Sequence, residues 1–535
     1  MTSEAPKEKK VFVRDATGLV RSLSPFDLFN LSFGQIMPAV GIVFIVSLSP
    51  FAFPQSNMFL AFLIAIPLVG LGPALLYSML GAAMPRTGGD YVYVSRVIHP
   101  ALGFMTNWLF TVTVISFIAD AGFVFPSSAL NIFVATIGQM TGNQSLVSNS
   151  AWFTTHTGEL VTGTILIVGV TILMVLGRAV WNFMKILFFI VMIGSIVNII
   201  YLLTVSNATF ITTFNNMFAS QGVTYNGLIQ SAVSAGYKTG WTLSGTIGGL
   251  VYAMAGLIGF NFAAYSGGEA KSSSKSVPIA IVGSLLVGGI LFALWAFGIY
   301  NAFGYDFFSA TNYLANCGCS SVTLPIPVSV NSLFTILQQN PVLEILGALA
   351  FGLAWIWLTP TDFIPVVRNM FAWSFDRVGP ERLADVNPRF GSPVKAIILT
   401  SVIGEILLVL FIYTSFPTAF ANTTILLNLV FFITSFSGIL LPYRAKSVFE
   451  QAPGWVKAKI GNVPVIVLVG IFSAIVQSIL LYGSFTNAFI GGAPASYPIA
   501  AGLAIGGLVI FYVARAYRRR QGINLDLVFK EIPPE

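Results

Sequence analysis

Charged residues are scarce in this sequence. Only 8% of its 535 residues are Asp, Glu, Lys or Arg, whereas a soluble domain carries about 25%. Residues 28–85 and 460–514 contain no charged residue, and a membrane-spanning helix needs only about 20 apolar residues. With 56% hydrophobic residues, the composition excludes a soluble globular class and predicts an all-α polytopic protein embedded in the lipid bilayer.

Cysteine and histidine are almost absent, with two residues of each. Cys317 and Cys319 are one residue apart, and we expect ordinary loop thiols because so close a pair makes a poor disulfide. The sequence has no metal-ligand spacing, phosphate-binding loop or nucleophile–base pair, so we expect no metal, no cofactor and no enzyme activity. The net charge of +7 lies in short loops, and we expect no nucleic-acid partner.

Proline, glycine and charged residues interrupt the apolar runs and predict about twelve spanning helices. Polar tails, 1–25 and 520–535, flank a single transmembrane domain, 26–519. The expected spans are 26–50, 57–83, 100–136, 161–178, 183–205, 243–268, 278–303, 342–374, 394–414, 419–443, 463–485 and 496–514.

Basic residues test this map, because loops that face the cytoplasm carry an excess of Lys and Arg. If the N-terminus is cytoplasmic and the spans alternate, 25 of the 26 basic residues lie inside and only Lys238 lies outside. We therefore expect a multi-pass plasma-membrane protein with both termini in the cytoplasm. Two long outside loops, near 206–240 and 304–340, are candidates for a cap over the outer mouth.

Helix-breaking residues lie near mid-depth in two of the expected spans. The first span, FDLFNLSFGQIMPAVGIVF (26–44), contains Gly34, Pro38 and Gly41, and the sixth contains Gly256 and Gly259. Within a membrane, freed backbone groups are tolerated only where they face protein or a polar cavity. The alternative is that these glycines only allow close helix packing.

The two interrupted spans are five spans apart. This spacing predicts two inverted repeats of five helices, 26–205 and 243–443, followed by two extra helices within 463–514. The half-helix ends at each break carry partial charges of both signs, which suit a carboxylate and an ammonium or another cation. A small molecule that bears both groups, such as an amino acid, matches these ends.

Three stretches on the predicted cytoplasmic side are distinctive. They are LLYSMLGAAMPRTGGDYVYVSRVIHPALGFMTNW (75–108), GFNFAAYSGGEAKSSSKSVPIAI (259–281) and VVRNMFAWSFDRVGPERLADVNPRFGSPVKAI (366–397). In this order they resemble the inner ends of helices two, six and eight, with the loops that follow, in the amino acid–polyamine–organocation transporter superfamily.

The resemblance implies a secondary transporter of amino acids or related amines. It implies twelve helices, with the broken helices one and six around a central site, and movement by alternating access. Glu269 and Lys271 would then form part of the inner gate or its hinge, together with Arg368.

The sequence also departs from the family pattern. Family members often break helix one at a Gly-Ser/Thr-Gly type motif, whereas this chain has IMPAVG (36–41). The backbone amides of Ala39, Val40 and Gly41 could still receive a carboxylate; the alternative is a substrate without one. At the position in helix five where some proton-coupled members have a lysine, this chain has Phe188, and we expect Lys185 to extend toward the cytoplasmic surface.

Acidic residues inside a span need a reason, because each costs about 2.5–3.5 kcal/mol on insertion scales. Asp120, in the third span, and Asp362, in the eighth, are our candidates for holding an ammonium or coupling transport to protons; local hydrogen bonding is the alternative for both. Glu405, in the ninth span, is expected to stabilise a packing contact.

The candidate substrate site combines both breaks with these two aspartates. Its residues are Gln35, Met37, Pro38, Ala39, Val40, Gly41, Ala255, Gly256, Ile258, Gly259, Phe260, Asn261, Asp120 and Asp362. The expected function is secondary transport of amino acids, coupled to H+ or Na+ or working by exchange. The alternatives are a transporter of polyamines or other organic amines and, less expected, a membrane sensor or channel with the same fold.

Overall fold

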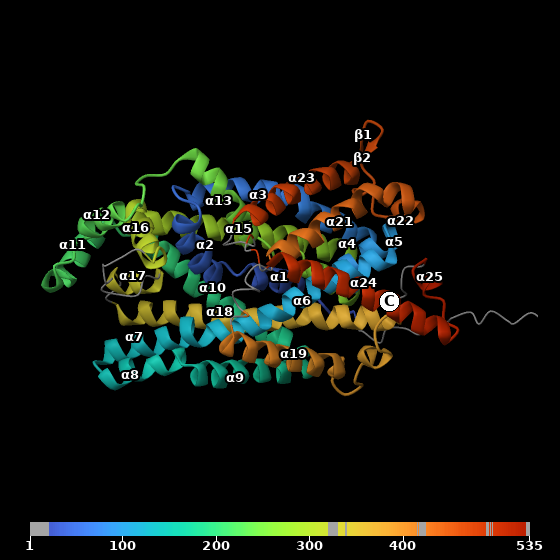
Figure 1. Cartoon of the computed structure of the whole chain (residues 1–535), viewed down its shortest axis with the longest axis horizontal. Coiled ribbons are helices and arrows are strands. Elements are labelled where there is room, and N and C mark those ends of the chain that lie inside the picture. Colours follow the sequence, from blue (N-terminus) through green and yellow to red (C-terminus); the bar gives the residue numbers. More distant parts are fainter. Residues whose placement is uncertain are drawn as a thin grey trace, which may run out of the picture.

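The computed structural model describes residues 21–318, 330–337, 340–414, 416, 424–487, 492, 494 and 496–530. Within these residues the chain is almost entirely helical, and most of the long helices run along the long axis of the molecule (Figure 1). The one sheet in this part of the chain is a two-stranded ribbon of β1 (Lys459–Ile460) and β2 (Val463–Pro464). The expected all-α class is confirmed.

Ten helices of the described chain are long and apolar enough to cross a membrane, and a bent pair of helices gives an eleventh span. The sixth expected span is broken into pieces too short to be counted, so the pattern agrees with about twelve spans. The helices of the ten are α3 (Met58–Val69) through η1 (Gly70–Ala74) to α4 (Leu75–Ala83), α6 (Pro100–Phe125) through η2 (Pro126–Leu130) to α7 (Asn131–Thr141), α9 (His156–Val175), α10 (Arg178–Thr204), α15 (Ser273–Phe303), α18 (Pro341–Phe375), α19 (Val394–Tyr413), α21 (Thr424–Arg444), α23 (Val465–Thr486) and α24 (Ser496–Arg520).

Short helices lie at both ends of the molecule (Figure 1). At one end, the two long loops predicted as a cap form α11 (Asn207–Met217), α12 (Tyr225–Ser234), α16 (Tyr305–Asn316) and α17 (Val330–Leu337), near α8 (Gln144–Ser150). Tyr225 stacks on Phe307 with ring centroids 4.4 Å apart, so α12 and α16 are packed together. Cys317, which ends α16, is disulfide-bonded, and our expectation of a free thiol there is wrong.

The first span is broken at Met37. Ser24 and Asp27 form a capping box that starts α1 (Pro25–Ile36), and Met37 then adopts a left-handed conformation with φ +38°. Pro38 begins α2 (Pro38–Ala52), since its fixed φ suits the first turn of a helix. A further bend, of 56° between residues 25–42 and 44–52, lies six residues beyond Met37. The break expected in this span is therefore present.

The sixth span is broken more extensively. Its first half is α13 (Leu243–Gly256), residues 257–261 form successive turns, and α14 (Phe262–Tyr265) follows. Gly259 has φ +125°, and a Cβ added there would lie 2.9 Å from the Gln35 side chain. Side chains are disfavoured at this φ, so glycine both permits the break and lets the two broken segments approach each other.

Ser32 ties the two breaks together. Its hydroxyl donates to the Phe260 carbonyl at 2.8 Å and accepts from the Ala263 amide at 2.9 Å. These bonds satisfy backbone groups that the loss of helix leaves without a partner, as a buried break requires. The two breaks therefore form one local structure in the middle of the molecule.

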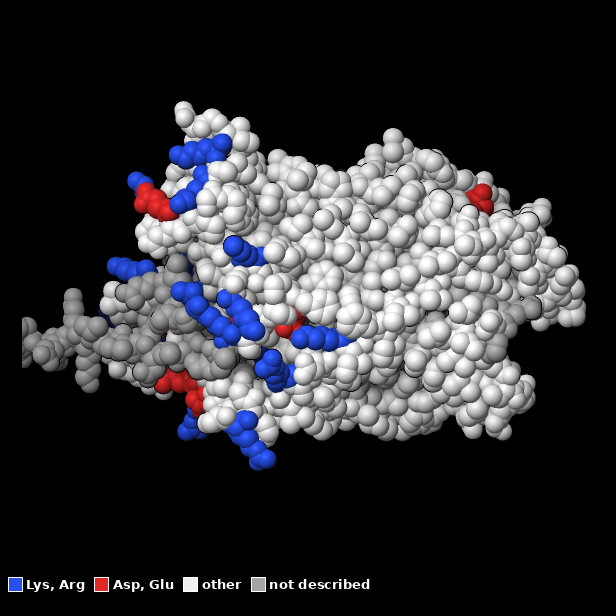
Figure 2. Space-filling model, turned by 180° about the vertical axis from the view of Figure 1, so that it is seen from behind, with Lys and Arg blue, Asp and Glu red and all other residues white. Residues whose placement is uncertain are grey.

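Charge is concentrated at one end of the molecule. Figure 2 shows Lys and Arg gathered at a single end of the elongated surface. This basic end contains the short helices α5 (Asp90–Val97), α22 (Lys446–Gln451) and α25 (Leu525–Val528). The distribution is the one that the alternating span map predicts.

Candidate functional site

A central cavity of about 230 Å³ lies between the two breaks. It is lined from α1 and α2 on one side and from the end of α13 on the other, with α6, α18 and α21 completing the wall. The lining residues are Gln35, Ile36, Met37, Val40, Gly41, Phe44, Ile45, Phe117, Asp120, Ala255, Gly256, Ile258, Trp355, Leu358 and Leu427.

Eight of the fourteen residues proposed from the sequence line this cavity. They are Gln35, Met37, Val40, Gly41, Asp120, Ala255, Gly256 and Ile258. Six others lie outside the lining: Pro38, Ala39, Gly259, Phe260, Asn261 and Asp362. Two of these six have other surroundings. Ala39 lines a small separate cavity, and the Phe260 ring packs between the rings of Tyr77 and Phe431.

Asp120 is the only charged residue among those that line the central cavity. It is half-buried on α6. Asp362, on α18, is close enough to Asp120 and Gln35 to interact with both. Asp362 is fully buried, and neither of its carboxylate oxygens has a hydrogen-bond partner among the described residues. The two aspartates therefore differ in access: one faces the cavity and the other lies behind its wall.

Gln35 separates Asp362 from the central cavity. Its side-chain oxygen accepts a hydrogen bond from the Thr361 hydroxyl at 2.9 Å. Thr361 precedes Asp362 on α18, and Gln35 lines the cavity from α1. Gln35 therefore lies next to both the buried carboxylate and the cavity.

The backbone at the two breaks is less available to a carboxylate than the sequence suggests. The amides of Val40 and Gly41 both donate to the Met37 carbonyl, at 3.1 and 2.9 Å, and Pro38 has no amide hydrogen. The opposite wall is the C-terminal end of α13, which carries partial negative charge. Both features favour a positively charged group in the cavity.

Few donors face the central cavity. The Trp355 indole N–H has no hydrogen-bond partner in the described part of the chain, and Gln35 contributes an amide. No lysine, arginine, histidine, serine or threonine is among the lining residues. The remaining wall is apolar and aromatic, so the cavity suits an ammonium group attached to an apolar body.

An aromatic layer lies on the basic-end side of the central cavity. It consists of Phe29, Phe33, Phe188 and Trp357, whose neighbouring ring centroids lie 5.4–6.0 Å apart. On α1, Phe29 and Phe33 fall between Asp27 and the cavity residue Gln35. Along α1, the layer therefore lies between the central cavity and the basic end.

A second cavity, of about 250 Å³, lies beyond this layer at the basic end. Two ion pairs line it. Arg368 binds Glu269 through two parallel hydrogen bonds of 2.7 and 2.9 Å, and each side chain is only 9% exposed. Lys185 Nζ lies 2.6 Å from Asp27 Oδ1, and its side chain is 35% exposed at the basic end, so Lys185 pairs with helix one as well as extending toward that end.

Backbone hydrogen bonds join the segment just before the first span to the segment just after the sixth span. The Leu23 amide donates to the Glu269 carbonyl at 3.0 Å, and the Lys271 amide donates to the Leu23 carbonyl at 3.1 Å. Lys271 itself has an exposed side chain that does not line the cavity. The basic ends of the first and sixth spans are therefore held together as one unit, which Arg368 ties to α18.

Asp90, in the TGGD turn, is fully buried at the start of α5. Asn107 Nδ2 donates to its carboxylate at 3.0 Å, and the Asn107 oxygen accepts from the Trp373 indole at 2.7 Å. Burial raises the pKa of Asp90 to about 7, although hydrogen bonds from Tyr265 and Asn107 act in the opposite direction. The group therefore titrates near neutral pH.

The sequence as a whole matches a known protein family. Residues 23–511 match the model of a family described as amino acid permease. The match covers the spans described above as far as residue 511 in α24, and it includes every lining residue of the two cavities except Ser22.

Proposed function

We propose that this chain, which belongs to the amino acid permease family and therefore transports amino acids or related organic compounds, is a secondary transporter that works by alternating access in the plasma membrane. The observation that carries the proposal is the central cavity, where two broken spans and Asp120 face the same space. Membership of the family implies a transporter rather than an enzyme.

Substrate binds in the central cavity. Its ammonium group pairs with Asp120 and with the carbonyl end of α13, where opposite charges attract. Its apolar part contacts Phe117, Trp355 and Leu427, which line the same space. The unpartnered Trp355 indole N–H is the donor available to an acceptor on the substrate.

Asp362 couples transport to protons. A buried carboxylate without a partner is stabilised by taking up a proton or a cation. Asp362 lies beside the cavity residue Gln35 and within range of Asp120, so binding of a cationic substrate at Asp120 changes the electrostatic environment of Asp362. Exchange without net proton movement, or coupling to Na+, is the alternative.

The basic-end cavity holds the gate. The first and sixth spans move as one group against α10 and α18, and the Glu269–Arg368 and Asp27–Lys185 pairs, which join these two groups, must separate in that movement. Because 25 of 26 basic residues belong to the segments assigned to one side, this end and both termini face the cytoplasm.

A second candidate function is transport of an organic amine that lacks a carboxylate. Two of the three amides expected to receive a carboxylate already donate to Met37, and the cavity lining contains no basic side chain or hydroxyl. Thermal-shift assays of the purified protein at two pH values, with neutral, cationic and acidic amino acids, polyamines and simple amines, separate the candidates. Leucine and isoamylamine, which differ by the carboxylate alone, are the matched pair.

Transport assays in proteoliposomes test the proposed coupling to protons. The Asp362→Asn variant is expected to retain substrate exchange but to lose accumulation driven by a pH gradient. The matched control is Glu405→Gln, which removes an intramembrane acid that binds Thr164 at 3.0 Å away from the cavity. Uphill uptake in Asp362→Asn equal to that of the control would remove Asp362 from the mechanism.

A further inference from the structure

A third cavity, of about 450 Å³, lies at the basic end, away from the transport pathway. Its walls come from α5 and the start of α6, from the end of α21 with α22, and from the C-terminal segment. The lining residues are Ser95, Arg96, Ile98, Pro100, Arg444, Ala445, Ser447, Val448, Asp526, Phe529 and Lys530. None of them lines the central cavity or the basic-end cavity with the two ion pairs.

The charges around this third cavity do not balance. Arg96 is paired with Asp376 at 2.6 Å, and Asp526, the only acid of the lining, is paired with Arg515 at 2.6 Å. Two lining cations remain, Arg444 and Lys530.

Neither of these two cations forms an ion pair within the described chain. Arg444 donates one hydrogen bond, to the Ile98 carbonyl at 3.2 Å, which leaves most of its five N–H groups for a ligand. The nearby Lys446 is paired with Glu450 at 3.7 Å. The cavity therefore carries two positive charges that no described carboxylate compensates.

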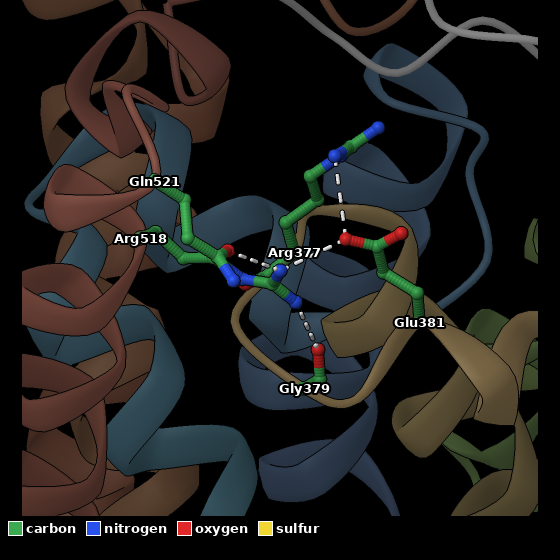
Figure 3. A network of polar contacts seen from close by, with 5 residues as sticks. All are labelled: Arg377, Gly379, Glu381, Arg518 and Gln521. Carbon is green, nitrogen blue, oxygen red and sulfur yellow. Dashed lines mark hydrogen bonds and ion pairs between the residues drawn. The ribbon is translucent and has the colours of Figure 1, made fainter.

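The C-terminal wall of the cavity is fixed in place. Arg518, at the end of α24, donates to the Arg377 and Gly379 carbonyls at 2.8 and 3.2 Å and binds Glu381 at 2.8 Å (Figure 3). Phe529 is buried, and the Arg96 guanidinium lies 4.8 Å from its ring centroid. The tail thus holds its place by contacts that do not use Arg444 or Lys530.

We propose that this cavity binds a phosphate-bearing anion, with Arg444 and Lys530 as its charged ligands and the Ser447 hydroxyl as a further donor. Arginine recognises phosphate through parallel N–H donors, and lysine acts as a point charge. Basic pockets between spans at a membrane surface suit the headgroup of an anionic phospholipid, and a soluble phosphate compound offers the same chemistry. Either ligand joins the C-terminal segment to α21.

Thermal unfolding of the full-length protein in neutral detergent measures binding. The probes are dioctanoyl phosphatidylglycerol, dioctanoyl phosphatidylcholine and glycerol 3-phosphate. We expect the anionic lipid to raise the melting temperature saturably. Arg444→Gln or Lys530→Gln alone should raise the half-saturating concentration about fivefold, and both together about 25-fold, since each basic residue at an anionic surface contributes about a factor of five.

Two controls separate charge from folding. Arg520→Gln removes a neighbouring cation that does not line the cavity and should leave binding unchanged, and Arg444→Lys should restore most of the affinity lost in Arg444→Gln. Saturation by glycerol 3-phosphate identifies a soluble phosphate as sufficient, and saturation by the lipid alone identifies the headgroup in its membrane. Equal effects of the two lipids, or an unchanged half-saturating concentration in the double variant, would overturn the proposal.

Discussion

The central cavity and the basic-end cavity are similar in size, about 230 and 250 Å³, yet they are chemically opposite. Both are lined by the first span, the sixth span and α18. The central one has an apolar wall with a single carboxylate, whereas the basic-end one is lined by two ion pairs. The same helices therefore line an apolar cavity with one carboxylate and a second cavity with two ion pairs.

Breaking the Glu269–Arg368 pair should give the largest effect, which is a loss of stability. Arg368→Gln leaves Glu269 buried without its partner, and removing one member of a buried pair costs about 3–5 kcal/mol. Thermal or denaturant unfolding measures the loss. The control is Lys395→Gln, whose pair with Asp385 is more than half exposed and contributes at most about 1 kcal/mol. Equal losses of unfolding free energy in the two variants would mean that the buried Glu269–Arg368 pair stabilises the protein no more than the exposed Asp385–Lys395 pair.

Asp120 should give the next largest effect, on binding rather than on stability. Asp120→Asn removes the one charged group of the central cavity, and a charge-assisted hydrogen bond contributes about 1.5–3 kcal/mol. The affinity for an ammonium ligand should fall about 10- to 100-fold in equilibrium binding. Glu405→Gln, whose acid lies outside the lining, should bind normally. Wild-type affinity in Asp120→Asn would remove the residue from the site.

The raised pKa of Asp90 predicts how the stability of the protein depends on pH. Because burial raises its pKa to about 7, the folded protein holds a proton that the unfolded chain has released above about pH 4. This contribution to stability is complete below pH 4 and is lost as the pH rises through about 7, by at most about 1.4 kcal/mol per pH unit. Asp90→Asn should flatten that slope in thermal unfolding. A slope equal to that of the wild type would contradict the assignment.

Breaking the Asp27–Lys185 pair should have the smallest effect on stability. The Lys185 side chain is 35% exposed, and Asp27 keeps its hydrogen bonds to Ser24 when the lysine is removed. Lys185→Gln should therefore lower the unfolding free energy by about 1 kcal/mol or less. A loss as large as that of Arg368→Gln would mean that both pairs hold the basic end equally.

Much of the fold follows from the sequence. The lack of charge marks the spans, and Gly259 marks the sixth-span break because only glycine readily adopts its φ of +125°. The first break is different, because Met37 adopts the left-handed conformation there and no residue preference indicates this. Pro38 signals an interruption but does not show where the helix ends.

Only part of the candidate site can be predicted from the sequence. Glu269 and Arg368 stand out as gate residues through the resemblance, but the pairing of residues 99 positions apart depends on how α18 packs. Trp355, Phe117 and Leu427 line the cavity, yet an apolar residue in a span looks the same whether it faces lipid or ligand. Asp362 lies behind Gln35 for a similar reason, since the side of a helix that faces a cavity is set by its neighbours.

The accessibility of Ile258 shows whether one central site opens to each side of the membrane in turn, because this residue lies in the sixth-span break and lines the central cavity. The measurement is labelling of Ile258→Cys by a membrane-impermeant thiol reagent, added to either side of proteoliposomes, in a background with both native cysteines replaced by serine. We expect labelling from each side in turn and protection from both sides by substrate. Labelling from one side alone under all conditions, or no protection by any transported compound, would contradict a single alternately exposed site.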